Sequence, residues 1–176
     1  MEICELVRRC HDYGAIQIDR EFAWLLERIL QLQNRKTAVE IGVMSGGTFY
    51  AFTRLFDCAI GIDITKHELP YDLKKPHEYI IGNSKDPEIL SRIKDDVDFL
   101  FVDGDHFYEG VSKDFELWYP KVRKGGLIAF HDIHGANIGE EHENGVKDFW
   151  NEIKNSYKVE EIITREKYYG IGIIWV

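Results

Sequence analysis

The chain has 176 residues, of which 44% are hydrophobic and 13% aromatic, enough for one well-buried domain and too few for two ordinary ones. Its formal net charge is -9, with 31 acidic and 22 basic residues. Because the basic residues are scattered along the sequence, we expect neither a nucleic acid nor a membrane as a partner.

The cysteines and the first residues bear on the cellular compartment. Cys4, Cys10 and Cys58 are odd in number and form no Cys-x-x-Cys pair, so neither a disulfide framework nor a zinc ribbon is indicated. The first residues lack the apolar stretch of a signal peptide, and no run approaches the roughly 20 apolar residues of a membrane-spanning helix. These features predict a cytoplasmic protein, and a homo-oligomer stays open.

The N-terminal segment, residues 1–34, is expected to be helical, because apolar residues recur at helical spacing between residues 18 and 33. We expect this segment to pack on a core formed by residues 35–176, within a single domain. The core opens with a strand, a glycine-led helix and a second strand, at residues 37–43, 46–56 and 58–63. This order is a βαβ unit.

The alternation of strands and helices then continues. Further strands are predicted at residues 77–82, 96–104 and 127–132, and further helices at 86–93, 108–122 and 142–157, with a turn at 123–126. Two last strands, at 159–164 and 168–176, are expected to form a hairpin. Because the core strands are nearly continuous apolar runs, helices should cover both faces of the sheet. The sequence therefore predicts a three-layer α/β domain that closes with a β-hairpin.

The turn "EIGVMSGGT", residues 40–48, joins the first strand of the core to its helix. Backbone amides and glycines at such a place favour an anionic ligand group that approaches closely. The dinucleotide pattern requires a glycine where Met44 stands, which disfavours a nicotinamide or flavin dinucleotide. Glu40 would repel a phosphate and attract an ammonium group, so a zwitterionic amino acid fits better. A tight turn without a ligand is the alternative.

Polar residues also end the next two strands. Asp63 stands where a carboxylate can accept hydrogen bonds from the hydroxyls of a ribose. Asn83 or Ser84 could bind the edge of an adenine, although Asp and Asn are also ordinary turn residues. Together, these strand ends predict a site for an adenosine that carries an amino acid, which is the outline of S-adenosylmethionine.

At this point the sequence resembles the class I S-adenosylmethionine-dependent methyltransferases, through "VEIGVMSGGT" followed by "IGID". The stretch "DFLFVDGDHFYEGVSKDFELWYPKVRKGGLIAFHDI" followed by "GVKDFW" is similar to the branch of macrocin-type O-methyltransferases and cephalosporin-hydroxylase-like proteins. The resemblance implies a Rossmann-like, mostly parallel seven-stranded sheet with an antiparallel C-terminal hairpin. The implied cofactor-binding residues are Glu40, Gly42, Ser45, Gly46, Gly47, Thr48, Asp63, Asn83, Ser84 and Asp103.

The resemblance also implies a divalent cation beside the methyl donor, held by Asp103 and Asp132. His131 stands where relatives often carry a second acid. An oxygen-rich site suits magnesium, whereas an imidazole shifts the preference toward manganese, iron or zinc. We therefore expect His131 as a third ligand and magnesium or manganese as the metal. The alternative is a polar strand end whose histidines face solvent.

The predicted reaction is metal-assisted methylation of a hydroxyl group on a small molecule, such as a sugar or a natural-product scaffold. A cation would lower the pKa of the hydroxyl, and Asp103, His106 and His131 are candidate proton acceptors. The acceptor pocket is expected to come from the N-terminal segment and from residues 65–76 and 134–145.

Two other functions are compatible with the sequence. The first is a non-catalytic S-adenosylmethionine-binding or scaffold protein, favoured by the missing acid at position 131. The second is a metal-dependent hydrolase that uses the Asp and His cluster directly, in which case the glycine turn would be only structural.

Overall fold

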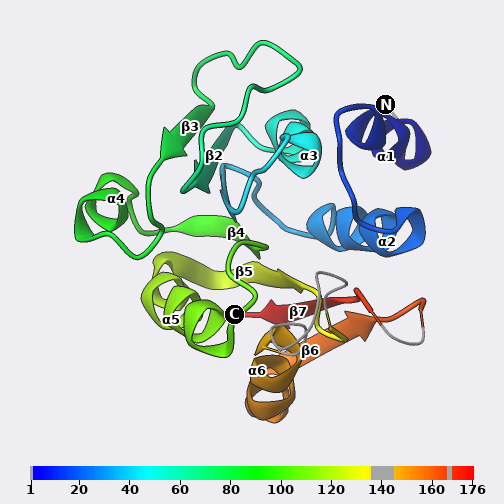
Figure 1. Cartoon of the computed structure of the whole chain (residues 1–176), viewed down its shortest axis with the longest axis vertical. Helices are drawn as coiled ribbons and strands as arrows, with labels where there is room; N and C mark the ends of the chain where they lie inside the picture. The colour runs from blue at the N-terminus through cyan, green and yellow to red at the C-terminus, as the bar shows by residue number, and fades with distance from the viewer. Residues whose placement is uncertain (1, 136–144, 166–167) are drawn as a thin grey trace.

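A seven-stranded sheet runs through the molecule between two layers of helices (Figure 1). The structure is a computed structural model that describes residues 2–135, 145–165 and 168–176. The strands are β1 (Thr37–Ile41), β2 (Cys58–Asp63), β3 (Glu78–Ile81), β4 (Val97–Val102), β5 (Val122–His131), β6 (Lys158–Ile162) and β7 (Ile171–Trp175). The predicted three-layer α/β fold is confirmed.

The strand order is β3-β2-β1-β4-β5-β7-β6. The strands from β3 to β5 pair in parallel, and β7 pairs antiparallel with both β5 and β6. The predicted antiparallel hairpin is therefore confirmed. Because the parallel strands point the same way, the residues that follow β1 to β5 share one edge of the sheet.

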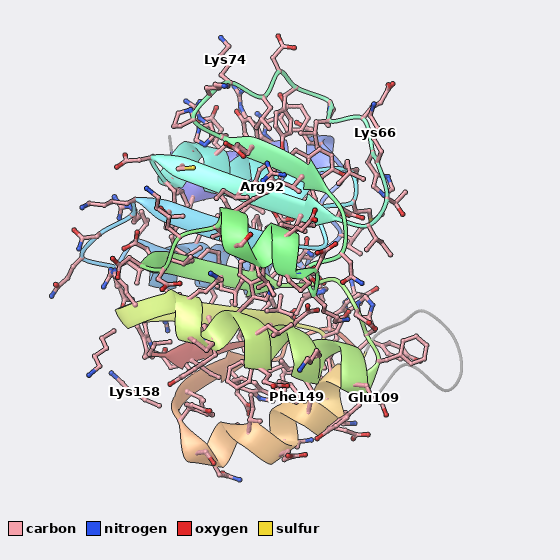
Figure 2. The ribbon with its side chains drawn as sticks, turned by 90° about the vertical axis from the view of Figure 1, so that its left-hand side faces the viewer. Lys66, Lys74, Arg92, Glu109, Phe149 and Lys158 are labelled. Carbon is pink, nitrogen blue, oxygen red and sulfur yellow. The ribbon has the colours of Figure 1, made fainter. Side chains whose placement is uncertain are left out.

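Helices cover the two faces of the sheet in chain order. One face carries α1 (Ile3–Asp12), α2 (Asp19–Ile29) and α3 (Gly47–Leu55), and the other carries α4 (Pro87–Arg92), α5 (Tyr108–Trp118) and α6 (Gly145–Ile153) (Figure 1). Figure 2 shows α4, α5 and α6 lying over the second face. The short turns η1 (Tyr119–Lys121) and η3 (Lys154–Ser156) follow α5 and α6. The boundary at residues 34 and 35 between a helical segment and a core stays a prediction.

Each face of the sheet has its own hydrophobic core, because successive side chains along a strand point to opposite faces. In β4, Phe99 and Phe101 pack with α2 and α3, whereas Leu100 and Val102 pack with α4 and α5. All four side chains are buried. Burying a side chain of this size stabilises a fold by roughly 1.5–3 kcal/mol, so β4 is held firmly from both sides.

The start of α4 is marked by a helix cap that can be recognised in the sequence. The Asp86 carboxylate accepts a hydrogen bond of 2.9 Å from the Glu88 backbone N–H, and Pro87 occupies the first turn. A cap of this kind stabilises a helix by about 1 kcal/mol, and proline at the first helical position needs no backbone donor.

The predicted turn at residues 123–126 is wrong, because these residues belong to β5. Arg123 donates a 2.5 Å hydrogen bond from Nε to the buried carboxylate of Asp98, which also accepts the backbone N–H groups of Lys36 and Thr37. Gly125 has a φ of +75°, and its N–H donates to the Val176 carbonyl at 2.6 Å. The glycines thus allow β5 to continue as an irregular strand where the sequence pattern predicts a turn.

The last two expectations concern the helix predicted from residue 142 and membrane-spanning helices. The helix expected from residue 142 begins within residues 136–144, which lie outside the described residues, and α6 is seen from Gly145 onward. Within the described ranges, no helix is both long enough and apolar enough to span a membrane.

Candidate active site

A cavity of about 620 Å³ opens at the edge of the sheet where β1 to β4 end. In open α/β sheets, ligands bind at this edge, where the strand order changes direction, which here is between β1 and β4. Predicted cofactor-binding and catalytic residues that line the cavity are Gly42, Asp63, Asn83, Ser84, Asp103 and His106. Strands far apart in the sequence thus bring these residues together.

The turn after β1 touches the end of β4 directly. Gly42 has a φ of +87°, and a Cβ atom built on it would overlap the backbone carbonyl group of Asp103. Only glycine combines this backbone conformation with so close an approach. The position of the Asp103 backbone therefore depends on the absence of a side chain at residue 42.

Asp63 fixes the same turn from the other side. Its Oδ2 accepts hydrogen bonds from the backbone N–H groups of Val43 at 2.9 Å and Met44 at 2.8 Å. Its Oδ1 accepts the Thr65 N–H at 2.8 Å. Since an ionised carboxylate offers about four acceptor positions, roughly one stays available to a ligand in the cavity.

Ser45, Gly46 and Gly47 do not line the cavity but lie where two other segments close over the turn. Ser45 Oγ donates to the Gly14 carbonyl at 3.1 Å, and Tyr71 donates its hydroxyl to the Gly46 carbonyl at 2.8 Å. A Cβ on Gly47 would overlap the backbone of Ala15. These glycines therefore give room to the N-terminal segment and to the chain between β2 and β3.

Glu40 and Thr48 lie beneath the turn, outside the cavity lining. Glu40 is 1% exposed, and the Thr48 hydroxyl donates a hydrogen bond to its Oε1. Its Oε2 is buried and has no hydrogen-bond partner among the described residues. Burial raises the pKa of the Glu40 carboxyl well above its usual range. The predicted contact of Glu40 with an ammonium group stays a prediction.

The end of the cavity beyond β3 contains a polar network that the sequence did not reveal. Ser84 Oγ donates to Asp114 at 2.6 Å, and Lys85 Nζ donates to Asp105 at 2.9 Å. Burial raises the pKa of Asp114. Asn83 accepts the Lys85 backbone N–H at 3.0 Å, as in an ordinary turn. Residues on α5 and on two loops thus form one wall.

Two acids and two histidines meet where β4 and β5 end. His131 Nδ1 lies 3.2 Å from Asp103 Oδ1 and 3.4 Å from Asp132 Oδ2. His106 Nε2 lies 2.9 Å from the same Asp132 oxygen. Asp132 has a φ of +61°, which is uncommon for a residue other than glycine and typical of functional sites. The predicted cluster therefore exists as a set of direct contacts.

The charges in this cluster stabilise one another. Burial acts to lower the pKa of His131, but the negative charge of Asp103 and hydrogen bonds to both acids outweigh it and raise the pKa. The hydrogen bond to Asp132 raises the pKa of His106. Burial acts to raise the pKa of Asp132, but the hydrogen bonds to His106 and His131 outweigh it and lower the pKa. Both imidazoles therefore favour their protonated forms beside Asp132, and each must release a proton before it can bind a cation or accept another proton.

The donor set of Asp103, His131 and Asp132 fits a divalent cation. One ligand atom from each residue lies within 4.8 Å of the others. The separations of 3.2 and 3.4 Å from His131 Nδ1 are close to the roughly 3.0 Å expected between neighbouring ligands of an octahedral ion with bonds of about 2.1 Å. In addition, Asp132 Oδ1 is buried without a hydrogen-bond partner among the described residues.

Gln17, between α1 and α2, is a site residue that sequence reasoning missed. Its side chain is buried, and Nε2 donates a 2.7 Å hydrogen bond to Asp103 Oδ2. The sequence carries no signal for it, because a single glutamine before a helix has no periodic or motif context. The N-terminal segment therefore contributes to the site as well as to packing.

Residues 39–133, more than half of the chain, match a family model described as a methyltransferase domain. The chain belongs to this methyltransferase-domain family. The resemblance to class I methyltransferases is thereby confirmed at the level of the family. The match includes every predicted site residue.

Curated relatives of this methyltransferase-domain chain carry no functional name. Uncharacterized protein y4gI of Sinorhizobium fredii is 43% identical over 67 residues, which are 38% of this chain and 7% of that protein. Uncharacterized protein R132 of Acanthamoeba polyphaga mimivirus is 33% identical over 112 residues, covering 54% of this chain and 51% of that protein. The chain thus spans about half of one relative and a small part of the other.

Solved structures confirm the fold of the methyltransferase-domain chain. The MycE methyltransferase from the mycinamycin biosynthetic pathway, in complex with Mg, SAH (S-adenosylhomocysteine) and mycinamycin VI, has a TM-score of 0.69 at 17% identity. That alignment covers 99% of this chain and 53% of MycE. A putative caffeoyl-CoA O-methyltransferase from Staphylococcus aureus has a TM-score of 0.67 at 18% identity, covering 99% and 93% of the two chains.

Proposed function

We propose that the chain is an S-adenosylmethionine-dependent methyltransferase that methylates a hydroxyl oxygen of a small molecule, a sugar or a natural-product scaffold, in the cytoplasm and with a divalent cation. The observation that carries this proposal is the cavity, because its lining brings Gly42 and Asp63 together with Asp103 and His106. Membership in the methyltransferase-domain family supports it.

The cofactor would lie along the ends of β1, β2 and β3. The remaining acceptor position on Asp63 suits a ribose hydroxyl, and Asn83 and Ser84 lie at the wall where an adenine would end. The amino-acid part would lie against the turn, with the buried Glu40 carboxyl as the acceptor for its ammonium group. Of the predicted cofactor-binding residues, five line the cavity, Gly42, Asp63, Asn83, Ser84 and Asp103, and the other five do not.

Asp103, His131 and Asp132 would hold the cation. When bound, the cation would lower the pKa of the acceptor hydroxyl and orient it. MycE supports this part of the proposal, because its complex contains both Mg and SAH. The chain itself would position the ligands: β4 and β5 are neighbours in the sheet, so Asp132 follows β5 beside Asp103, which lines the cavity.

Transfer breaks the bond between the sulfonium sulfur and the methyl carbon while the bond to oxygen forms, and the hydroxyl proton must go to a base. Asp103 and His106 line the cavity, whereas His131 does not. We therefore place Asp103 and His106 ahead of His131 as proton acceptors. A side chain must be within hydrogen-bond reach of the proton that it removes.

Calorimetric titration with S-adenosylhomocysteine, with and without Mg²⁺, tests the cofactor site. We expect saturable binding with one site per chain, and an absence of binding would overturn the proposal. The metal-dependent hydrolase would also be excluded by such binding, because it requires no adenosine site.

Activity separates the enzyme from a non-catalytic binding protein. Incubation with S-adenosylmethionine labelled in the methyl group, over a panel of hydroxylated sugars and natural products, should transfer label to at least one acceptor. Binding without transfer to any hydroxylated compound would favour the binding protein. MycE, whose complex contains mycinamycin VI, suggests glycosylated natural products as the first group to try.

A further inference from the structure

Gln17 makes the closest side-chain contact with Asp103 from outside the strands. Its Nε2 donates to Asp103 Oδ2 at 2.7 Å, across 86 positions of sequence. The side chain is 3% exposed. Gln17 also lies outside residues 39–133, the part of the chain that matches the family model.

The two oxygens of Asp103 have different partners as a result. Oδ2 accepts from Gln17, whereas Oδ1 faces His131 Nδ1 at 3.2 Å. A carboxylate with one oxygen held in this way cannot rotate freely about the Cβ–Cγ bond. Outer hydrogen bonds of this kind orient the ligands of metal sites.

We infer that Gln17 is a positioning residue that fixes the Asp103 carboxylate for cation binding. The inference rests on the function proposed above, since it assigns the cation to Asp103, His131 and Asp132. It adds a residue of the N-terminal segment to a site whose other members follow the strands of the core.

The backbone around Gln17 is itself held in place. The Gly14 carbonyl accepts the Ser45 hydroxyl at 3.1 Å, and the Ala15 carbonyl lies 2.8 Å from His11 Nδ1. On the other side, the Phe22 N–H donates to the Ile18 carbonyl at 2.9 Å, at the start of α2. The segment can therefore present Gln17 in one position without help from a ligand.

A second observation also points to a ligand. Gln17 Oε1 is buried and has no hydrogen-bond partner among the described residues. An unpaired buried acceptor costs about 1–3 kcal/mol, and such groups in native structures call for a functional explanation. A hydroxyl or a water molecule held next to the cation would satisfy this oxygen.

The test measures cation binding directly, with Mn²⁺ as the probe and electron paramagnetic resonance as the readout. Gln17→Met keeps the length of the side chain but removes its donor. We expect the variant to bind Mn²⁺ about 10–100-fold more weakly, the usual effect of losing an outer hydrogen bond. The exposed Gln33 offers a matched control, and Gln33→Met should bind Mn²⁺ like the unaltered chain.

A second control separates positioning from a general loss of stability. Phe22→Leu shortens a fully buried side chain on α2 and should lower the melting temperature without altering a contact of Asp103. If Phe22→Leu weakens Mn²⁺ binding as much as Gln17→Met does, Gln17 acts only through packing and the inference is overturned.

The remaining outcomes are also distinct. If the unaltered chain binds Mn²⁺ and Gln17→Met binds it equally well, the positioning role is wrong and the proposed cation site stands. If the unaltered chain shows no Mn²⁺ binding, the cation role in the proposed function fails, and the inference fails with it. Titration with S-adenosylhomocysteine then still reports on the cofactor site.

Discussion

Gly42 and Asp103 are in direct backbone contact, because a Cβ atom on Gly42 would overlap the Asp103 carbonyl group. This contact joins the turn that borders the cavity to the strand that carries the acid. The geometry of the predicted cofactor site and that of the predicted cation site are therefore coupled through one residue without a side chain.

Gly42→Ala should disrupt both parts of the site. The substitution forces alanine into a φ of +87° and against a neighbouring backbone, and we expect a loss of about 3 kcal/mol or more in the free energy of unfolding. Urea denaturation measures it. Gly125→Ala is the matched control: its φ is +75°, but the added Cβ would meet only the Arg123 side chain, at 3.3 Å. An equal loss in both variants would contradict the role of the close approach.

Asp63→Asn should weaken cofactor binding. The amide keeps one oxygen, so at least one of the backbone N–H groups of Val43, Met44 and Thr65 loses its acceptor. Hydrogen bonds to charged groups contribute roughly 1.5–3 kcal/mol, and we expect the affinity for S-adenosylhomocysteine to fall at least about tenfold in calorimetry. Asp57→Asn, at an exposed position just before β2, should leave the affinity unchanged.

Glu40→Gln should change how stability depends on pH. Because burial raises the folded-state pKa of Glu40 above the ordinary 4.5, the folded chain holds this proton more tightly than the unfolded chain. The original protein should therefore lose stability as the pH rises above about 4.5, by up to about 1.4 kcal/mol per pH unit, until the folded-state pKa is reached. The glutamine variant lacks this slope. Urea denaturation between about pH 5 and 8 should show that the stability of Glu40→Gln, relative to the original protein, increases with pH. If the difference in stability between the two proteins stayed constant with pH, Glu40 would not be the cause.

Asp132→Ala should abolish tight cation binding. Loss of an outer hydrogen-bond partner typically weakens metal binding 10–100-fold, so loss of a ligand should weaken Mn²⁺ binding by at least about 100-fold. The exposed Asp57 provides the control, because it precedes β2 and so lies at the opposite edge of the sheet from the cluster. Asp57→Ala should bind Mn²⁺ like the unaltered chain. If Asp132→Ala kept full transferase activity, the metal mechanism would be refuted.

The sequence predicted the strands and the residues that follow them because these signals are local. The apolar runs before Asp63 and Asp103 are continuous, and Asp86 with Pro87 marks the start of α4. Parallel strands then bring their carboxyl ends to one edge, and the resemblance to methyltransferases implied that Asp103, His131 and Asp132 lie together there, as the structure places them.

What the sequence could not show are contacts between distant segments. Gln17 reaches Asp103 across 86 positions, and Lys85 reaches Asp105 from a different loop. Neither residue belongs to a periodic pattern. The turn predicted at residues 123–126 was wrong for a related reason. Glycines and charges predict a turn, whereas contacts with distant residues, Arg123 with Asp98 and Gly125 with Val176, extend β5 through this segment.

The place of β7 in the sheet has a consequence for synthesis. Although β7 follows β6 in the chain, it lies between β5 and β6, and Ile171 pairs with His131. The growing polypeptide therefore exposes the edge of β5 until β7 leaves the ribosome, and an unpaired edge invites aggregation. A translation product that stops before residue 171 would lack the neighbour of His131, so an incomplete chain should be a target for chaperones and proteases before it could become an active protein.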